Sequence, residues 1–291
     1  MGQAVKTEIF SGKAFSGSID RETEKLVERF VSIQGRKPKL LIIDPTQSEE
    51  TKVYGRSKIR KADRLGIETF PLFLTSPDSN GNPLEIMENI ISEVNPDGII
   101  VERPYPYWLD SFYIEQIIPE YLDIEGISIK SQGKNMIGYP YILPATADAA
   151  MRIILSLGED HSKNVCIINR STIVGRPLAM ALLNKDFTVT MCHSKTRDLK
   201  SITRASDIVV SAIGKPGYIT TDFISEGASL IDIGTTEVKG NIVGDIDYNS
   251  VLGKAAFVTP VPGGVGPVTT SVLFSNMMKA SIDRIEERLN F

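Results

Sequence analysis

The chain has 291 residues, of which 42% are hydrophobic and 23% are charged, the proportions of a folded protein with room for two modest domains. Its net charge of -4 and the lack of a concentrated Lys/Arg run argue against nucleic acid as a partner. Its two cysteines, Cys166 and Cys192, lie in apolar runs and are too few for a disulfide-stapled scaffold. The first ten residues lack the apolar core of a signal peptide, and no segment has the apolar length that spans a bilayer. We therefore expect a cytoplasmic protein that does not bind membranes.

Short apolar runs alternate with amphipathic helical stretches along nearly the whole chain, which is the pattern of βα units with parallel strands. In the first half, the pattern predicts strands at residues 39–44, 68–74 and 98–103 and helices at residues 20–32, 47–65 and 83–94. In the second half, it predicts strands at residues 164–168, 188–192, 207–213, 229–233 and 256–261 and a helix at residues 175–184.

The fold class predicted from this order is α/β, with two βα-type domains of which the second is a Rossmann-like, doubly wound parallel sheet. A helix at residues 145–157 carries the predicted boundary, and a last helix at residues 269–289 has the length to pack back on the first domain. The predicted domains are therefore 1–145, 146–268 and the C-terminal helix 269–291.

The turn after the strand at residues 164–168 is the first candidate nucleotide site. It passes through Asn169, Arg170 and Ser171 and delivers the chain into a helix at Gly175. The partial positive charge and unpaired N–H groups of a helix N-terminus suit a pyrophosphate. The turn lacks the G-x-G-x-x-G fingerprint, however, and an ordinary βα turn closed by Gly175 and Pro177 explains it equally well.

The end of the next strand indicates which nucleotide this half would prefer. NAD enzymes usually place an acidic residue there to bond the ribose hydroxyls, whereas this chain has His193, Ser194, Lys195 and Thr196. With Arg170 and Lys195 expected at the same edge, a 2′-phosphate would be attracted rather than repelled. Each of these residues alone is more simply explained as a surface residue, but together they favour NADP over NAD.

Three segments resemble those of methylenetetrahydrofolate dehydrogenase/cyclohydrolases, namely residues 170–177, 192–196 and, most specifically, 259–267, which read RSTIVGRP, CHSKT and TPVPGGVGP. Turn propensity alone would make the last of these a Gly/Pro loop. The likeness extends from Ser11-Gly12-Lys13 to Asn276 and so covers nearly the whole chain. The resemblance implies a homodimer without a metal, with NADP on the second domain and folate in a cleft between the domains.

Tyr54 and Lys58 are four residues apart in a helical stretch, so both side chains lie on one face. Without the resemblance, a half-buried tyrosine beside a solvated lysine is the simpler interpretation. The resemblance implies that Tyr54 stacks on the folate ring system and that Lys58 serves the chemistry at the one-carbon bridge.

The same resemblance extends to further site residues. The implied catalytic group is Tyr54, Lys58, Glu102 and Glu125. The implied substrate-binding residues are Tyr54, Val101, Glu125, Pro262, Gly263, Gly264 and Pro267. The implied cofactor-binding residues are Asn169, Arg170, Ser171, Ser194, Lys195 and Thr235. The implied reaction is hydride transfer from 5,10-methylenetetrahydrofolate to NADP, followed by hydrolysis of the methenyl product to 10-formyltetrahydrofolate.

The chain departs from the family pattern at several of these positions. Glu102 stands where the family usually has glutamine, and an ion pair with it would favour the charged form of Lys58, which puts the cyclohydrolase step in doubt more than hydride transfer. Glu125 replaces a shorter aspartate but can still accept the donor edge of a pterin. Asn169 replaces a glycine in the phosphate turn. Ala145-Thr146-Ala147 replaces Cys-Thr-Pro.

Three other readings of the sequence stay open at this point. One is a dehydrogenase of a modified pterin such as methylenetetrahydromethanopterin, suggested by Glu102, Arg103 and Glu125. Another is a catalytically silent NADP-binding regulator, against which the retention of Tyr54 and Lys58 argues. A third, an α/β dehydrogenase of some other substrate, would not need the loop at residues 259–267.

Overall fold

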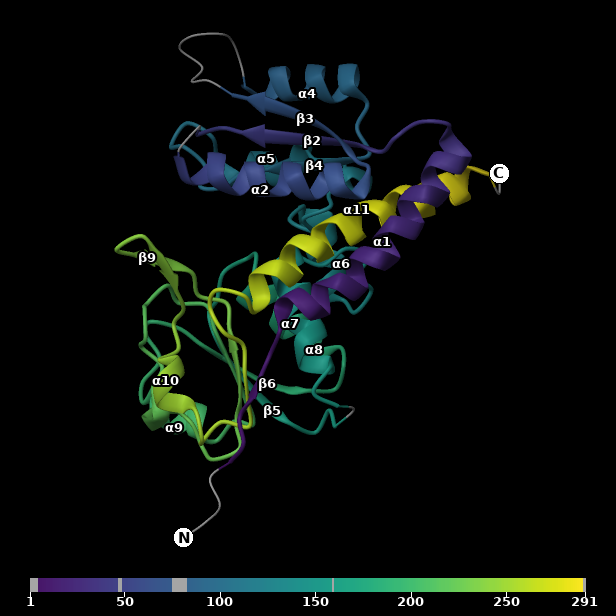
Figure 1. Cartoon of the computed structure of the whole chain (residues 1–291). Coiled ribbons are helices and arrows are strands. Elements are labelled where there is room, and N and C mark those ends of the chain that lie inside the picture. The colour runs from purple at the N-terminus through teal and green to yellow at the C-terminus, as the bar shows by residue number, and fades with distance from the viewer. Residues whose placement is uncertain (1–4, 47–48, 75–82, 159, 290–291) are drawn as a thin grey trace. The chain divides into compact units, whose positions relative to one another are not determined.

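A computed structural model describes residues 5–46, 49–74, 83–158 and 160–289 (Figure 1). The chain divides into two compact units, the first formed by residues 1–17 and 134–272 and the second by residues 18–133 and 273–291. We call them the six-stranded unit and the three-stranded unit after the main sheet that each contains among its described residues. The predicted domain limits at residues 145 and 268 stay a prediction.

The sheet of the six-stranded unit is parallel at each described pairing. Its strand order is β1 (Glu8–Ile9), β11 (Phe257–Val258), β8 (Ser229–Asp232), β7 (Ile208–Ser211), β5 (Asn164–Ile168) and β6 (Thr188–Cys192). From β5 the chain first adds β6 on one side and then returns to add β7 on the other. Such a reversal opens a crevice at the carboxyl ends of the strands, where α/β sheets bind their ligands.

Helices and a hairpin complete this unit. They are α7 (Ala145–Leu155), α8 (Gly175–Leu183), α9 (Leu199–Arg204), α10 (Tyr248–Val251) and the antiparallel pair β9 (Thr236–Val238) and β10 (Asn241–Val243). The central strands β5, β7 and β8 are buried on both faces, which explains why β5 reads as an uninterrupted apolar run from Val165 to Ile168. The apolar core continues beneath α9 and α10 through buried residues such as Phe223 and Val251.

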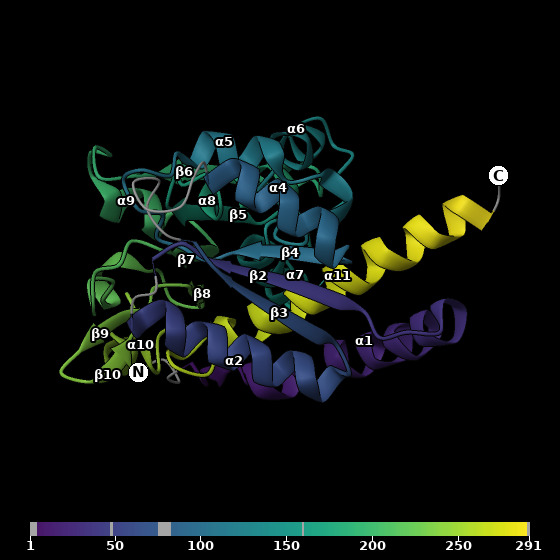
Figure 2. The same ribbon diagram turned by 90° about the horizontal axis from the view of Figure 1, so that it is seen from above.

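The sheet of the three-stranded unit has the order β3 (Glu68–Phe73), β2 (Lys39–Asp44) and β4 (Gly98–Val101), again parallel. α2 (Glu49–Leu65) joins β2 to β3, and α4 (Pro83–Val94) joins β3 to β4. Because the two crossovers run in opposite directions and right-handed crossovers are the rule, the helices must cover opposite faces. Figures 1 and 2 show α2 and α4 on the two sides of this sheet.

Three further helices and the end of the chain contribute to this unit. α5 (Ser111–Ile117) follows β4, α6 (Ile129–Met136) leads out of the unit, and most of α1 (Gly12–Gln34) precedes β2. The C-terminal part of α11 (Val265–Leu289) packs here, since Asn276 donates to the Ile124 carbonyl and Ser281 to the Asp97 carbonyl, each at 3.3 Å.

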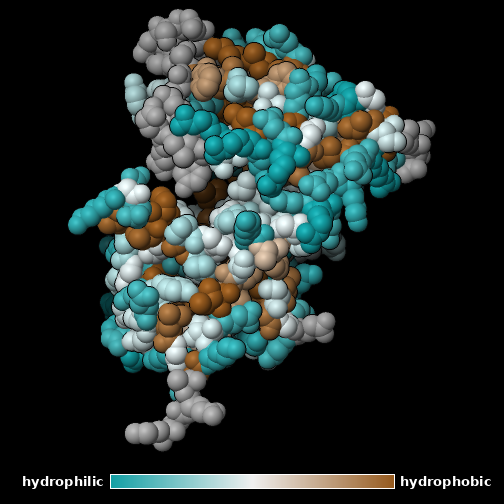
Figure 3. All heavy atoms as spheres, in the orientation of Figure 1, coloured by the Kyte–Doolittle hydropathy of each residue, from teal (hydrophilic) through white to brown (hydrophobic). Residues whose placement is uncertain are grey.

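The surface of both units mixes polar and apolar residues. Figure 3 shows hydrophobic areas interspersed with hydrophilic ones, as is normal for a protein surface, much of which is always apolar. Within the described part of the chain, no helix combines the length and apolar character needed to cross a membrane.

Candidate active site

The carboxyl edge of the three-stranded sheet gathers four of the residues that the sequence singled out, Lys58, Val101, Glu102 and Glu125. Asp44 lies opposite Phe73, and Ile43 lies opposite Val101, so the three strands end at the same edge. The N–H of Glu102 donates to the Ile43 carbonyl at 2.8 Å and continues the ladder one residue beyond β4. The position of Glu102 is therefore set by the sheet itself rather than by a free loop.

Lys58 and Glu102 form a close ion pair at this edge. The Nζ of Lys58, on α2, donates to both carboxylate oxygens of Glu102, at 2.8 and 2.7 Å. The side chains are only 19% and 7% exposed, so solvent screens the pair weakly. The contact expected between these two residues is present, and both carboxylate oxygens of Glu102 take part in it.

Glu125 lies beside the same strand end. A parallel bridge between Ile99 and Asp123 aligns its segment with β4, and its Oε2 accepts the Val101 N–H at 3.3 Å. Burial raises the pKa of the Glu125 carboxyl above its usual range; the charge of Lys58 opposes that rise and the charge of Glu102 adds to it. Lys58, Glu102 and Glu125 therefore form one electrostatic cluster.

Asp123 is the residue that holds the turn carrying Glu125. Its buried carboxylate accepts N–H bonds from Ile127 at 3.0 Å and Ser128 at 2.8 Å, and a hydroxyl bond from Ser131 at 2.7 Å. A carboxylate satisfied by three donors is a rigid support. It gives Glu125 a fixed backbone next to Val101.

A small cavity of about 140 Å³ opens beside Glu102. It is lined by Ile42, Asp44, Gly55, Arg56, Ile59, Pro71, Phe73 and Glu102, and most of its wall is apolar. Asp44 turns its carboxylate to the N–H of Thr46, at 3.0 Å. Tyr54 lies on α2 near this edge, but its side chain is outside the described residues, so its predicted stacking role stays a prediction.

In the six-stranded unit, the turn between β5 and α8 is closed by the side chain of Asn169. Its Oδ1 accepts the N–H groups of Ser171 at 2.8 Å and Gly175 at 3.0 Å, and its Nδ2 donates to the Ala212 carbonyl at 2.5 Å. The Arg176 N–H donates to the Ser171 carbonyl at 3.0 Å. The turn thus uses the N–H groups of Ser171, Gly175 and Arg176 itself, and the expectation that this helix start takes a pyrophosphate stays a prediction.

The cationic residues predicted for a 2′-phosphate leave the sheet at neighbouring positions. Ile168 lies opposite Cys192, so the segments that begin with Asn169 and His193 emerge side by side. Arg170, Ser194 and Lys195 are all exposed there. The turn of residues 193–196 is held by the His193 Nδ1, which accepts the Lys195 N–H at 3.1 Å. Residues 193–197 contain no carboxylate, so this edge carries positive charge.

Two buried carboxylates, Asp232 and Asp245, fix the loops at the carboxyl ends of β7 and β8. Asp232 accepts three backbone N–H bonds of 2.8 to 3.1 Å, from Gly234, Asp245 and Ile246. Asp245 accepts two backbone N–H bonds and one hydroxyl bond of 2.7 to 2.9 Å, from Ile213, Lys215 and Ser211. Sequence reasoning assigned the two aspartates no role.

Glycines make this arrangement of Asp232 and Asp245 possible. A Cβ on Gly234 would clash with the carboxylate of Asp245, and a Cβ on Gly244 would clash with that of Asp232. Burial raises the pKa of Asp232 to about 7, although its backbone N–H bonds act in the opposite direction. Thr235, which follows Gly234 directly, is exposed at the end of this braced segment.

The loop at residues 259–264 is tied to both β8 and the N-terminal segment. Thr259 Oγ1 accepts the Asp232 N–H at 2.7 Å, and the Gly12 N–H donates to the Gly263 carbonyl at 2.9 Å. A Cβ on Gly12 would clash with the carbonyl oxygen of Gly264. The loop carrying Pro262, Gly263 and Gly264 is thus held by the start of the chain, a contact that the sequence did not predict.

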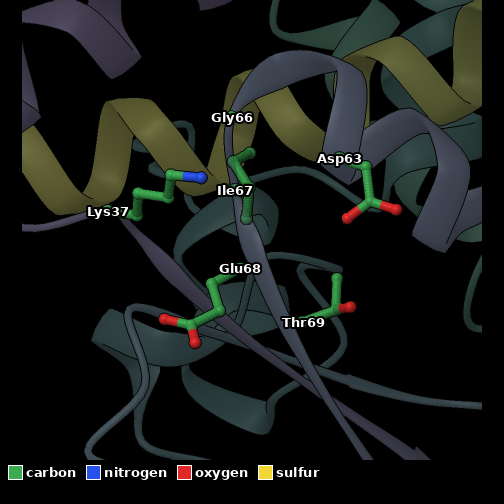
Figure 4. A pocket seen from close by; sticks show the side chains of 6 residues that line it. All are labelled: Lys37, Asp63, Gly66, Ile67, Glu68 and Thr69. Atoms are coloured by element: carbon green, nitrogen blue, oxygen red, sulfur yellow. The ribbon is translucent and has the colours of Figure 1, made fainter.

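A second hollow of about 400 Å³ lies near the amino ends of β2 and β3, away from the Lys58 cluster. Figure 4 shows its lining residues: Lys37, Asp63, Gly66, Ile67, Glu68 and Thr69. Its charged side chains are exposed and of both signs, so they single out no ligand. Among the described residues, no group of three or more His, Cys, Asp or Glu side chains is arranged to hold a metal ion.

A parallel sheet with a topological reversal is typical of nucleotide-binding α/β proteins, and the second parallel sheet adds a lysine–carboxylate cluster, so the general class is a two-unit α/β enzyme that binds a nucleotide. Residues 10–125 match the catalytic domain of the tetrahydrofolate dehydrogenase/cyclohydrolase family, and residues 144–285 match its NAD(P)-binding domain. The chain belongs to the tetrahydrofolate dehydrogenase/cyclohydrolase family, enzymes of folate one-carbon metabolism. The resemblance and the α/β fold predicted from the sequence are confirmed.

Similar proteins match over nearly their full length. The bifunctional protein FolD of Thermoplasma volcanium is 36% identical over 262 residues, which are 90% of this chain and 92% of that protein. The structure of the bifunctional enzyme of Thermoplasma acidophilum is 33% identical with a TM-score of 0.86, covering 96% of this chain and all of that one. The Trypanosoma brucei enzyme, solved with NADP and an inhibitor, is 33% identical with a TM-score of 0.88, covering 96% and 99%.

Proposed function

We propose that this chain oxidises 5,10-methylenetetrahydrofolate with NADP and that the residues at the carboxyl edge of the three-stranded sheet bind the folate. The observation that carries the proposal is the compact cluster of Lys58, Glu102 and Glu125 at that edge. Glu125 accepts the guanidine-like donor edge of the pterin, since a carboxylate can take two such bonds at once. Tyr54 stacks on the ring, and the backbone at Val101 borders it.

Hydride transfer depends mainly on alignment of the two bound rings, so the side chains need to do little beyond holding them in place. The nicotinamide nucleotide supplies the hydride acceptor when it is bound. The protein contributes orientation, through the loop of Pro262, Gly263 and Gly264, with Pro267 at the start of the following helix, and through the segment that ends at Thr235. Asp232 is bonded to both segments, to Thr259 through its N–H and to the Gly234 N–H through its carboxylate, and these bonds support such a fixed geometry.

Hydrolysis of the methenyl product depends more on Lys58. Water attacks the methenyl carbon, the ring opens to the 10-formyl product, and a proton must leave the attacking water. The amine of Lys58 is the group placed to help move that proton, and in this structure its Nζ is engaged by both carboxylate oxygens of Glu102. We therefore propose that Glu102 shifts the balance of the two activities toward the dehydrogenase.

One assay tests these claims together. Purified protein receives methylenetetrahydrofolate with either NADP or NAD, and absorbance is followed at the wavelengths of reduced nucleotide and of methenyltetrahydrofolate. The proposal expects reduced nucleotide to form with NADP. It also expects methenyltetrahydrofolate to persist after it has formed, once its spontaneous hydrolysis has been corrected for. Turnover only with a modified pterin, or binding of NADP without turnover, would instead favour the alternatives left open by the sequence.

The preference for NADP rests on the cationic edge beside β6. We propose that Arg170 and Lys195 bind the 2′-phosphate, that Ser194 adds a hydroxyl donor, and that Asn169 and Ser171 shape the turn beside them. The exposure of both cations and the lack of a carboxylate in residues 193–197 fit such a group.

Replacing both Arg170 and Lys195 with alanine is expected to raise the KM for NADP about 100-fold, since each charged phosphate contact contributes roughly 1.5 kcal/mol. The KM for NAD should change less than threefold, because NAD lacks the 2′-phosphate. Steady-state kinetics with each nucleotide measures the difference, and Lys185→Ala, at another exposed lysine of the same unit, is the matched control. Equal losses with NADP and NAD would contradict this assignment.

The contact of Gly12 with the loop at residues 259–264 leads to another prediction. Gly12→Ala is expected to raise the KM for the folate about tenfold, because the added methyl group displaces the Gly264 carbonyl and overpacking of this kind costs about 1 to 3 kcal/mol. Steady-state kinetics with varied folate measures the KM. Gly133→Ala, at a helical glycine with open space around it, is the control. An unchanged KM in Gly12→Ala would show that the loop does not need this anchor.

We also propose that the chain forms a homodimer, as its resemblance to the family implies. Size-exclusion chromatography with light scattering measures the mass directly. A species of twice the chain mass of 32.0 kDa supports the proposal, and a monomer over the whole concentration range would contradict it.

A further inference from the structure

The described side chains of α2 carry an excess of positive charge, although the chain as a whole has a net charge of -4. The stretch from residue 55 to residue 65 contains one carboxylate, that of Asp63, and five cationic side chains: Arg56, Lys58, Arg60, Lys61 and Arg64. A local excess of one sign raises the concentration of ligands of the opposite sign. Whether α2 attracts an anion depends on how many of these cations are already paired.

Three of the five cations are paired with carboxylates of the protein. Lys58 is bonded to Glu102. Asp20, on α1, takes both Lys61 and Arg64, the latter at 3.0 Å. The side chains of Glu102 and Asp20 are only 7% and 13% exposed, so these pairs are part of the folded structure. An anionic ligand would reach these three cations only by displacing a bond that already exists.

Arg56 and Arg60 are the two cations that remain. Both are exposed, and within the part of the chain that the structure describes neither guanidinium has a carboxylate, a carbonyl or an aromatic ring as its partner. They are four residues apart on one helix, so their side chains lie on one face with Cβ atoms about 5 to 6 Å apart. Two like charges at this spacing repel each other. The unpaired charge of α2 is therefore concentrated in one pair, and an anion bound between the two arginines would relieve their repulsion.

Arg56 borders the candidate active site. It lines the cavity of about 140 Å³ together with Glu102, the residue that binds Lys58. Because α2 follows β2 and leads into the parallel strand β3, its N-terminal end lies at the carboxyl edge of the sheet and its C-terminal end toward the amino ends of the strands. Arg60 is one turn farther from the carboxyl edge than Arg56. The pair of arginines thus leads from the site outward along the helix.

The folate proposed for this site carries its negative charge at one end. Beyond the pterin and the one-carbon bridge it has a p-aminobenzoyl group joined to glutamate, and each further glutamate joined through a γ-carboxylate adds one more negative charge. Arginine holds a carboxylate with two parallel N–H bonds, which makes it the side chain best suited to this group. With the pterin at Glu125 and the bridge at Lys58, the glutamates are the part of the substrate that matches two unpaired arginines.

We propose that Arg56 and Arg60 bind the glutamate tail of the folate, with Arg56 on the first glutamate and Arg60 on the next γ-linked one. The inference rests on the proposed function, which places a folate at this edge of the sheet. An extended α-linked residue spans about 3.5 Å, and the two extra methylene groups of a γ-linked one bring successive carboxylates near the spacing of arginines one helical turn apart. The arginine pair therefore sets a specificity, since folates with two or more glutamates bind more tightly than the monoglutamate.

The first test measures affinity by isothermal titration calorimetry with three ligands: tetrahydrofolate, its triglutamate, and tetrahydropteroyl amide, in which an amide replaces the glutamate. The wild type is expected to bind the triglutamate about tenfold more tightly than tetrahydrofolate, the gain that one charged hydrogen-bonded pair gives. Arg60→Gln should reduce this ratio to less than about twofold. Arg56→Gln should weaken the binding of tetrahydrofolate about fivefold and leave that of the amide within about twofold, because the amide has no carboxylate to lose.

A charge reversal separates an electrostatic role from a structural one. Arg60→Glu should reverse the order of the affinities, so that the triglutamate binds more weakly than tetrahydrofolate, whereas Arg60→Lys should keep part of the preference because it keeps the charge. Raising the salt concentration to about 0.5 M should reduce the preference of the wild type, since exposed charges are screened. Lys37→Gln, at an exposed lysine near the amino end of β2, is the matched control and should keep all three affinities.

The outcomes separate the tail site from the function on which it rests. Equal affinity of the wild type for tetrahydrofolate and its triglutamate, or a preference that Arg60→Gln leaves unchanged, would overturn the tail site and leave the folate function in place. If the protein binds none of the three ligands, p-aminobenzoyl triglutamate becomes the probe. Binding of that probe that Arg56→Gln and Arg60→Gln both weaken supports the tail site and contradicts the folate function, and absence of binding contradicts both.

Discussion

Replacing Lys58 with methionine is expected to slow the hydrolysis of methenyltetrahydrofolate about 100-fold or more, which is the usual contribution of a positioned proton-transfer group. Methionine keeps much of the length of the side chain but cannot exchange a proton. Hydride transfer should survive within about tenfold, because that step depends on alignment of two rings. Stopped-flow absorbance of methenyltetrahydrofolate, with and without NADP, measures the two steps separately.

Two further variants distinguish loss of the Lys58 amine from a disturbance of the strand end that carries Glu102. Lys58→Met alone leaves the buried Glu102 without the amine that it binds, which could disturb the strand end. The double variant Lys58→Met with Glu102→Gln removes that charge and should show the same loss of hydrolysis. Glu102→Gln alone should hydrolyse faster than the wild type, because the Lys58 amine is then no longer held by two carboxylate oxygens. Lys25→Met, at an exposed position on α1, is the control, and intact hydrolysis in Lys58→Met would show that the assignment is wrong.

The strands that sequence reasoning located best are those buried on both faces. β2 and β5 have the predicted limits, because a parallel strand covered on both sides reads as a continuous apolar run between polar turns. β1 and β11 are different, since each has only two residues and β1 exposes both of its side chains. β1 was not predicted, because its pairing with β11 is a long-range contact that no local pattern encodes.

Helix limits were less accurate where small residues begin a helix. α1 starts at Gly12 rather than at residue 20, because its first two turns contain glycine, serine and alanine and give little apolar periodicity. α11 starts at Val265 rather than at residue 269. Pro267 lies in its first turn, where proline is tolerated because its missing N–H has no partner to lose.

The contacts of the candidate site also include some that the sequence predicted and some that it did not. Contact between Lys58 and Glu102 was predictable, because the resemblance paired their positions and opposite charges attract. The turn at Asn169 was not, since which N–H groups its amide takes depends on the path of the turn. The roles of Asp232 and Asp245 were missed, although an acidic residue at the end of an apolar run with a glycine nearby is a signal of a buried carboxylate.

The second large effect is expected at Asp97, which joins three parts of the three-stranded unit. Its carboxylate, 1% exposed, accepts from Arg36 at 2.7 and 3.0 Å, from Arg284 at 2.9 Å and from the Lys39 N–H at 2.9 Å. Its carbonyl accepts the Ser281 hydroxyl at 3.3 Å. The residue thus binds the start of β2 and the C-terminal part of α11 to the loop before β4.

Asp97→Ala is expected to lower the free energy of unfolding by about 3 to 5 kcal/mol, the cost of removing one partner from a buried ion pair. Two arginines lose their shared anion and the Lys39 N–H loses its acceptor. The bond to Asp97 raises the pKa of Arg36, and without that partner the guanidinium still stays charged, because arginine does not deprotonate near neutral pH. Urea unfolding followed by circular dichroism measures the change.

Asp63→Ala, at an exposed carboxylate on α2, is the control for Asp97→Ala and should change the unfolding free energy by less than about 0.5 kcal/mol. Asp97→Asn separates charge from shape, since asparagine keeps one acceptor for the Lys39 N–H but leaves both guanidinium groups without an anion. It should lie between the wild type and Asp97→Ala. A loss below about 1 kcal/mol in Asp97→Ala would mean that water replaces the carboxylate at both arginines, and that this buried network does not hold α11 to the sheet.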